Sequence, residues 1–248
     1  MKNFLLVTDL DNTLVGDDLA LAKLNQLLTQ HREQYGTQIV YATGRSLTLY
    51  HELATERSLL EPDALITSVG TEIYLKGYTT PDSIWSSKLS HHWNRTQVAQ
   101  IATHFTDLIP QPETEQGKFK ASYFLTPEAA RTVLPQLQQE LQTNGIAAKL
   151  IYSSSQDLDI LPQQADKGAA MTFLRQSWQI EPTRTIACGD SGNDLALFQN
   201  RQECGIIVGN AQPELLQWHH ATPNPKRYLA NAHCAGGILE GLEHFSFL

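Results

Sequence analysis

The chain of 248 residues has few cysteines and no long apolar run. Its cysteines, Cys188, Cys204 and Cys234, are odd in number and widely spaced, which excludes a disulfide framework and a zinc-binding pattern. No apolar stretch approaches the ~20 residues that a bilayer-spanning helix needs, and the apolar run near Met1 is too short for a signal peptide. We therefore expect a cytoplasmic protein without a membrane partner.

An excess of basic residues is also lacking. Lysine and arginine number 18 against 26 aspartate and glutamate residues, which gives a formal net charge of −8. Nucleic acids and anionic membrane surfaces need a basic face, so neither is expected as a partner. A small anionic substrate is compatible with this charge, because the charge inside a pocket can oppose the sign of the whole chain.

What the sequence does contain is an alternation of apolar strands and amphipathic helices. Runs that are apolar and β-branched indicate buried strands. Five such runs occupy residues 4–7, 39–42, 64–68, 184–188 and 205–208. Helices are expected between the first three runs, over about residues 17–35 and up to about residue 60. This spacing predicts an α/β fold with a Rossmann-like, doubly wound sheet of parallel strands.

The pattern changes in the middle of the chain. Two segments there resemble helices, at residues 93–108 and 127–144, and two resemble strands, at residues 120–125 and 148–152. Helices beside strands that can form hairpins are typical of a small α+β unit. We therefore predict one core, residues 1–80 and 163–248, with an inserted α+β cap at residues 81–162.

Two carboxylates, Asp9 and Asp11, come directly after the first buried strand. Burying charge there is costly unless something compensates it, and doubly wound sheets bind ligands at the carboxyl ends of their strands. One carboxylate could attack a phosphorus centre while its neighbour handles the proton. Because an aspartate after a strand is also common in ordinary turns, the interpretation depends on partners elsewhere in the chain.

Two further clusters could bind phosphate. Thr43, Gly44 and Arg45 follow the second strand, where glycine permits close approach of the backbone and the threonine hydroxyl and nearby N–H groups can hold phosphate oxygens. Lys167 lies at the predicted start of a helix, against the preference of the helix dipole. This position favours a fixed positive charge that faces a nucleophile and a phosphoryl group. The alternatives are a helix-entry turn and a solvated lysine.

The last cluster is the string Gly-Asp-Ser-Gly-Asn-Asp at residues 189–194, which follows another buried strand. Magnesium takes oxygen ligands in a near-octahedral shell. Asp190 and Asp194 supply such oxygens, together with a carboxylate and a backbone carbonyl from the first cluster. Asn193 could ligate the metal or orient a neighbouring group.

Charge balance makes a metal a requirement of this interpretation. The predicted metal-binding residues are Asp9, Asp11, Asp190 and Asp194. About four negative charges in one cleft would repel a phosphate that adds nearly two more. Mg²⁺ contributes two positive charges and Lys167 a third. The residue types do not distinguish Mg²⁺ from Mn²⁺, since both accept an oxygen shell.

The four clusters, in this order and with an insert between the second and third, resemble the haloacid-dehalogenase superfamily of phosphohydrolases in its branch with an α+β cap. Much of the chain is similar to the sucrose-phosphate phosphatases of cyanobacteria and plants. The stretches that carry this likeness are residues 9–16, 41–46, 70–74, 190–194, 210–216 and 234–245. The resemblance implies magnesium-dependent hydrolysis of sucrose 6-phosphate to sucrose and phosphate, the last step of sucrose synthesis.

The resemblance also implies a role for each matching residue. Asp9 resembles the nucleophile that forms an aspartyl-phosphate, and Asp11 resembles the acid that protonates the leaving sugar oxygen and then the base that activates water. Thr43 and Lys167 match the phosphate-stabilising positions. Metal-binding positions are matched by Asp190, Asn193 and Asp194, and further substrate contacts are expected at Gly44, Arg45 and Asn193.

In the cap, Lys120, Ser122 and Asp159 are predicted sugar contacts, because they lie on its expected strands or on the return to the core. The substrate choice stays open between sucrose 6-phosphate and another sugar or polyol phosphate. A sugar phosphomutase and a non-catalytic binding module are the competing classes. We expect a monomer, and association with a sucrose-phosphate synthase is a hypothesis about its partners.

Overall fold

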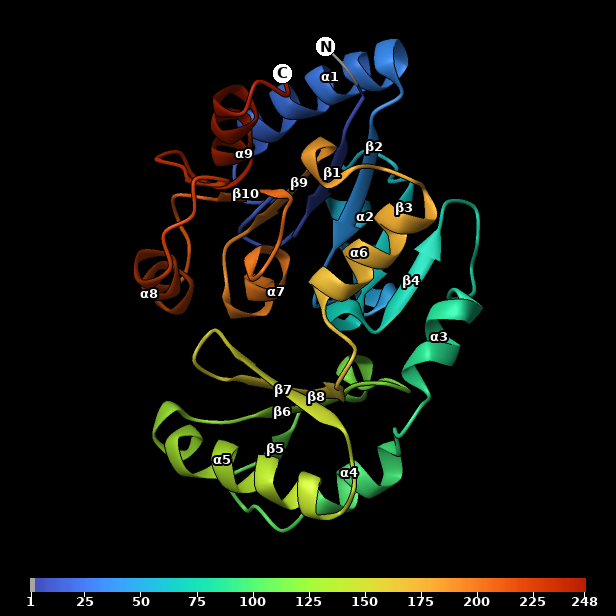
Figure 1. The fold of residues 1–248 in the computed structure, drawn as a ribbon, viewed down its shortest axis with the longest axis vertical. Helices are drawn as coiled ribbons and strands as arrows, with labels where there is room; N and C mark the ends of the chain where they lie inside the picture. The colour runs from blue at the N-terminus through green and yellow to red at the C-terminus, as the bar shows by residue number, and fades with distance from the viewer. Residues whose placement is uncertain (1–2) are drawn as a thin grey trace.

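A computed structural model describes residues 3–248, so the first two residues of the core segment predicted at 1–80 lie outside the described residues. The chain forms two layered units, a larger sheet with helices on both faces and a smaller sheet with helices on one face (Figure 1). The first described residues and the C-terminus both lie on the larger unit. Among the described residues, no helix combines the length and the apolar character that crossing a membrane requires.

The larger sheet has seven strands in the order β11-β10-β9-β1-β2-β3-β4. They are β1 (Leu5–Thr8), β2 (Gln38–Ala42), β3 (Ala64–Thr67), β4 (Glu72–Leu75), β9 (Thr185–Gly189), β10 (Cys204–Ile207) and β11 (Arg227–Leu229). Neighbouring strands pair in parallel except β3 and β4, which are antiparallel at one edge. The predicted doubly wound α/β sheet is confirmed, and its two edge strands, β4 and β11, had not been predicted.

Different helices bury the two faces of this sheet. Leu6 packs in one apolar cluster with α1, α2 and α9, whereas Leu5 and Val7 pack in another with α3, α6, α7 and α8. Successive side chains of a strand point to opposite faces, so a strand buried on both sides is apolar throughout. The helices are α1 (Asp18–Tyr35), α2 (Leu47–Glu56), α3 (Ser83–Leu89), α6 (Lys167–Ser177), α7 (Leu195–Phe198), α8 (Pro213–Ala221) and α9 (Cys234–His244).

The smaller sheet is antiparallel, in the order β5-β6-β8-β7. Its strands are β5 (Ile109–Pro110), β6 (Ala121–Phe124), β7 (Ala148–Ser153) and β8 (Asp157–Pro162), and its helices are α4 (Arg95–Ala102) and α5 (Pro127–Thr143). The helix predicted over residues 93–108 is therefore too long, since α4 ends at Ala102. Thr103 donates its hydroxyl to the carbonyl of Gln100 at 2.6 Å, a local bond that competes with continuation of the helix.

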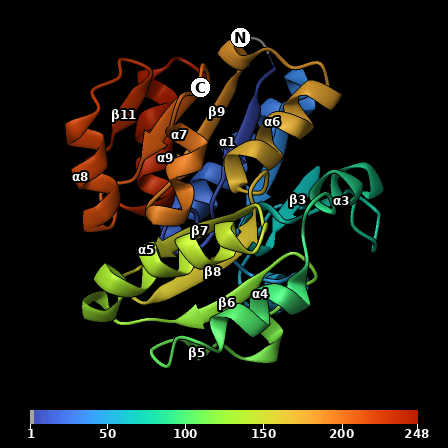
Figure 2. The same cartoon turned by 60° about the horizontal axis from the view of Figure 1, so that its bottom comes forward.

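The two faces of the smaller sheet differ in polarity. Tyr123 and Leu158 pack in an apolar cluster with α4 and α5, whereas Ser122, Asp157 and Asp159 lie at alternate positions and thus on the opposite face. Figures 1 and 2 show this sheet between its two helices and the larger unit. The polar face is therefore turned toward the larger sheet.

Short helical turns complete the fold, at η1 (Ser68–Gly70), η2 (Glu113–Glu115), η3 (Pro182–Arg184) and η4 (Gly192–Asp194). Helix α3 falls inside the segment predicted as cap but packs on the larger unit. Its Trp85 is fully buried, donates its Nε1–H to the carbonyl of Gly70 at 3.1 Å and lies 5.2 Å from the ring of Phe173. The chain therefore leaves the larger unit after α3 and returns to it between β8 and α6.

Candidate active site

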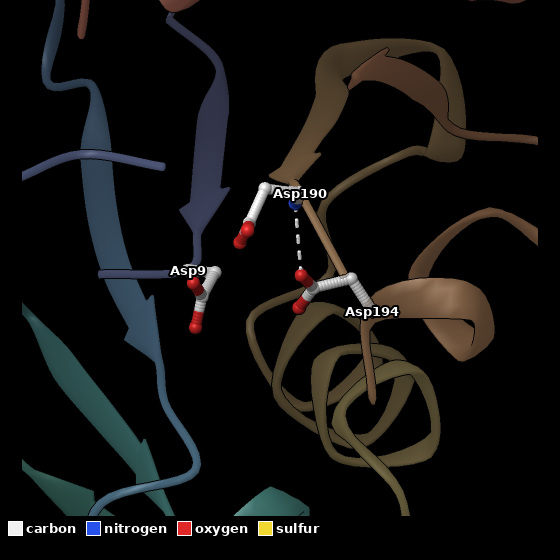
Figure 3. Close-up of side chains that lie close together, drawn as sticks. All are labelled: Asp9, Asp190 and Asp194. Atoms are coloured by element: carbon white, nitrogen blue, oxygen red, sulfur yellow. Dashed lines mark hydrogen bonds between the residues drawn. The ribbon is translucent and has the colours of Figure 1, made fainter. Parts of the chain in front are cut away.

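Three buried carboxylates converge at the carboxyl end of the larger sheet (Figure 3). Asp9 follows β1, Asp190 follows β9 and Asp194 lies in η4, and one oxygen of each lies within 4.8 Å of the others. Strands β1 and β9 are adjacent and parallel, with Thr8 opposite Cys188. The residues that follow these two strands are thereby held side by side, which explains why segments far apart in sequence meet here.

The loop after β9 is shaped by its own carboxylate. Asp194 Oδ2 accepts hydrogen bonds from the backbone N–H groups of Asp190, at 3.0 Å, and Ser191, at 3.1 Å. A Cβ on Gly189 would lie 2.5 Å from the Cβ of Asp194, a distance that side chains do not adopt. Only glycine therefore lets this loop close on itself. Thr13 donates its hydroxyl to Asp190 Oδ1 at 2.9 Å and fixes the second carboxylate.

Lys167 supplies the positive charge inside the cluster. Its Nζ lies 2.7 Å from Asp9 Oδ1 and 2.7 Å from Asp194 Oδ1, and the side chain is fully buried. Asp166 caps helix α6 by accepting from the N–H of Ala169 at 2.6 Å, which places Lys167 at the first helical position. Burial disfavours the charged amine, but the two carboxylates outweigh it and raise the pKa of Lys167.

One lysine does not balance three carboxylates. Burial raises the pKa of Asp9 to about 7, even though Lys167 opposes this shift, with a further upward contribution from Asp194. Burial and the charge of Asp194 raise the pKa of Asp190 to about 8. The Oδ1 atom of Asn193 is also buried, without a hydrogen-bond partner among the described residues. An all-oxygen donor set with excess negative charge fits a hard divalent cation.

The carboxylate of Asp11 is not part of this cluster. It forms a two-pronged ion pair with Arg45, in which Nε lies 2.8 Å from Oδ2 and Nη2 lies 2.8 Å from Oδ1. Both residues line the same cleft as Asp9. The structure thus brings three of the four predicted metal-binding carboxylates together, and a contribution from the main chain of Asp11 stays a prediction.

Of the predicted phosphate-binding residues after β2, Gly44 and Arg45 line the same cleft, whereas Thr43 is not among its lining residues. Thr43 is buried, and its hydroxyl oxygen accepts from the N–H of Arg45 at 3.1 Å. Gly44 lines the cleft and presents its carbonyl to Lys120 Nζ at 3.3 Å. A Cβ on Gly44 would lie 3.7 Å from the side-chain nitrogen of Asn193. The segment of residues 43–45 therefore lies beside the loop after β9 and also beside the smaller unit.

The predicted cap residues form one hydrogen-bonded group. Lys120 Nζ lies 3.6 Å from Asp159 Oδ1 and 3.3 Å from Glu115 Oε2. Ser122 donates its hydroxyl to Asp159 Oδ1 at 2.5 Å. Lys120 and Asp159 line the cleft, whereas Ser122 reaches it through Asp159. The structure therefore places these residues, predicted from strand position alone, opposite the carboxylate cluster.

The cleft has a volume of about 510 Å³ and lies between the two units. The lining residues that the sequence reasoning missed include Gln111, Glu115, Phe124, Ser153, Ser154 and Asp157. Phe124 and Asp157 could have been found, because they share the two-residue period of Ser122 and Asp159 on paired strands. Gln111 lies in a loop and Glu115 in the short turn η2, for which the sequence pattern carries no signal.

Fold and cluster together define a haloacid-dehalogenase-like protein. A solved haloacid dehalogenase-like hydrolase from Bacillus subtilis shares the fold at 18% sequence identity, with a TM-score of 0.69 over 100% of this chain and 93% of that chain. The profile of the family described as sucrose-6F-phosphate phosphohydrolase matches residues 2–246, and the chain belongs to that family.

Individual relatives are similar over almost the whole chain. The X-ray structure of the sucrose-phosphatase from Synechocystis sp. PCC6803, in complex with sucrose and phosphate, is 43% identical, has a TM-score of 0.92 and covers 99% of both chains. Probable sucrose-phosphatase 2 of Arabidopsis thaliana is 42% identical over 97% of this chain. Mannosylfructose-phosphate phosphatase of Agrobacterium fabrum is 33% identical over 97% of this chain and 96% of its own length. The chain spans only 59% of the length of the Arabidopsis relative.

Proposed function

We propose that the chain is a magnesium-dependent phosphatase that hydrolyses sucrose 6-phosphate to sucrose and phosphate. The observation that carries this proposal is the cleft itself, in which Asp9, paired with a fully buried lysine, faces the polar side of a second sheet. One wall supplies groups for phosphoryl transfer and the other supplies hydrogen-bonding groups for a sugar. The Synechocystis relative, solved with sucrose and phosphate, supports this substrate.

The proposed mechanism has two steps. Lys167 engages Asp9 Oδ1, which leaves Oδ2 to attack phosphorus and form an acyl-phosphate while the bond from phosphorus to the sugar oxygen breaks. Asp11 donates a proton to that oxygen, so that the sugar leaves with a free hydroxyl group. In the second step Asp11 takes a proton from water as the water attacks the acyl-phosphate. Inorganic phosphate is released and the Asp9 carboxylate is restored.

The remaining groups stabilise charge rather than transfer atoms. Asp9, Asp190 and Asp194 would hold Mg²⁺, which when bound neutralises the phosphoryl oxygens. Lys167 keeps Asp9 oriented and offsets part of the negative charge. Thr43, Gly44, Arg45 and Asn193 are proposed phosphate contacts, from the segments that follow β2 and β9 on the larger unit.

We further propose that the segment predicted as a cap, residues 81–162, selects the sugar for a core of residues 1–80 and 163–248 through the smaller unit that it forms after α3. Lys120, Ser122 and Asp159 are its candidate sugar contacts, because their group faces the carboxylate cluster across the cleft. The identity of the sugar depends on this face. The relative from Agrobacterium makes another disaccharide phosphate the second candidate substrate. Cytoplasmic location, a monomeric state and association with a sucrose-phosphate synthase stay predictions.

The test is a panel of sugar phosphates, assayed for phosphate release with Mg²⁺, with Mn²⁺ and with a chelator. We expect sucrose 6-phosphate to give the highest kcat/KM and the chelator to abolish turnover. Asp9→Asn should lower kcat by about 10³-fold or more, because it removes the nucleophile. Asp107→Asn, an exposed aspartate outside the cleft, is the matched control. Turnover that survives Asp9→Asn, or phosphoryl transfer between sugars without phosphate release, would contradict the proposal.

A further inference from the structure

Glu214 connects the two units through a single oxygen atom. This residue lies in the first turn of α8, on the larger unit. Its Oε1 accepts a hydrogen bond from the backbone N–H of Ser154 at 3.2 Å and another from the backbone N–H of Gly192 at 3.3 Å. Ser154 belongs to the turn between β7 and β8, whereas Gly192 belongs to the loop that carries Asp190 and Asp194. The carboxylate therefore bridges the smaller sheet and the carboxylate cluster.

The turn that Glu214 contacts has a defined conformation. Ser154 and Ser155 have φ values of 53° and 55°, and the N–H of Gln156 donates to the carbonyl of Ser153 at 3.2 Å. Two consecutive left-handed residues match the twist of the two strands of a hairpin. Glycine and asparagine adopt this conformation more readily than the serines present here. In Figure 1 this turn projects from the smaller sheet toward α7 and α8. Ser153 and Ser154 also line the cleft.

The contact between the turn and the catalytic loop is close. A Cβ built on Gly192 would lie 3.0 Å from the carbonyl oxygen of Tyr152, 3.3 Å from Cγ of Glu214 and 3.4 Å from Cβ of Ser153. The end of β7 thus lies directly on the loop that positions Asp194. A larger side chain at Gly192 would therefore push the turn away. Close packing and the two hydrogen bonds of Glu214 thus hold the turn at the same place.

We propose that Glu214 is a positioning residue, which fastens the turn at Ser154 to the loop at Gly192 and thereby holds the polar face of the smaller sheet over Asp9. Only the expected effect on turnover rests on the proposed function; the contact of Glu214 with Ser154 and Gly192 does not. The simpler alternative is that Glu214 merely places negative charge at the start of α8, where the helix dipole favours it. That alternative needs neither Ser154 nor Gly192.

The test compares two substrates. Sucrose 6-phosphate spans the cleft, whereas p-nitrophenyl phosphate lacks the sugar that would reach the smaller sheet. Glu214→Ala should lower kcat/KM for sucrose 6-phosphate by about three- to tenfold, mainly through KM, as expected for the loss of roughly one net hydrogen bond to a partly buried carboxylate. The loss for p-nitrophenyl phosphate should be clearly smaller. Glu214→Gln should recover most of the activity, because the amide oxygen accepts the same two bonds.

Hydrogen exchange measures the contact without any turnover. Amides of residues 148–158 should exchange faster in Glu214→Ala than in the wild type, and Gln217→Ala, an exposed residue of the same helix, should have no such effect. Unchanged exchange, or equal losses for the two substrates, would overturn the proposal. If the wild type hydrolyses neither substrate, the proposed function fails, and the exchange result alone decides whether Glu214 holds the turn.

Discussion

Replacement of Lys167 by methionine should destabilise the protein in proportion to the negative charge that then stays buried without a cation. The lysine Nζ makes 2.7 Å contacts to Asp9 and Asp194 and is fully buried. Methionine retains much of the side-chain volume, so the change removes the cation more than the packing. Removing one partner of a buried ion pair costs about 3–5 kcal/mol. We expect about 3 kcal/mol near pH 8, the lower end of the range, because Asp9 and Asp190 can take up protons instead.

The size of this effect should depend on pH. Even with the lysine present, the pKa of Asp9 is raised to about 7 and that of Asp190 to about 8. Both carboxyls are therefore largely neutral at low pH, where they need no cation. In the unfolded chain these two carboxyls lose their protons near the ordinary carboxyl pKa, whereas in the folded variant they keep them to higher pH. The free energy of unfolding of the variant therefore falls as pH rises. The difference between Lys167→Met and wild type should thus be small near pH 5 and largest near pH 8.

Urea unfolding of metal-free protein at several pH values measures this difference. A loss of about 3 kcal/mol corresponds to a decrease in Tm of about 6–12 °C for a chain of this length. Lys76→Met is the control, because Lys76 pairs with Glu61 at 2.8 Å on the surface, and an exposed pair contributes about 1 kcal/mol or less. If Lys167→Met were as stable as wild type near pH 8, or lost the same amount at every pH, the charge argument would be refuted.

Two other variants probe the same cleft. Asp190→Asn removes a carboxyl whose pKa is raised to about 8, so it should flatten the fall in stability that metal-free wild type shows between about pH 5 and 8; an unchanged slope in the unfolding series would contradict this. Arg45→Ala removes both guanidinium hydrogen bonds that orient Asp11, so kcat for sucrose 6-phosphate should fall about tenfold. An unchanged kcat in steady-state assays would show that this ion pair has no part in turnover.

The centre of the site was accessible from the sequence because it is built where strands end. Asp9 and Asp190 each follow a continuous apolar run, and the two runs become adjacent parallel strands. Strand pairing alone then brings the carboxylates together. Lys167 was detectable for a different reason, since a lysine in the first turn of a helix opposes the helix dipole and so indicated a partner of opposite charge.

Other features depend on contacts between segments that no local pattern relates. The side chain of Asp11 turns toward Arg45 rather than toward the carboxylate cluster, a choice that depends on the path of the chain after β2. The segment that forms α3 fell within the predicted cap bounds because it follows the change in sequence pattern, yet Trp85 is buried among apolar residues of the larger unit. Glu214 carries no signal of its own, because an acidic residue early in a helix is ordinary.

Stability, metal affinity and substrate affinity in this cleft share one physical cause. Three buried carboxylates share a single lysine, which leaves an excess of negative charge, and burial together with the charge of Asp194 raises the pKa of Asp9 and Asp190. A divalent cation relieves this excess charge, and a phosphate ester adds to it again. Each ligand should therefore bind more tightly when the other is present, by the same factor in both directions. We propose that the core sets this coupling through charge alone and that the polar face of the smaller sheet selects the sugar.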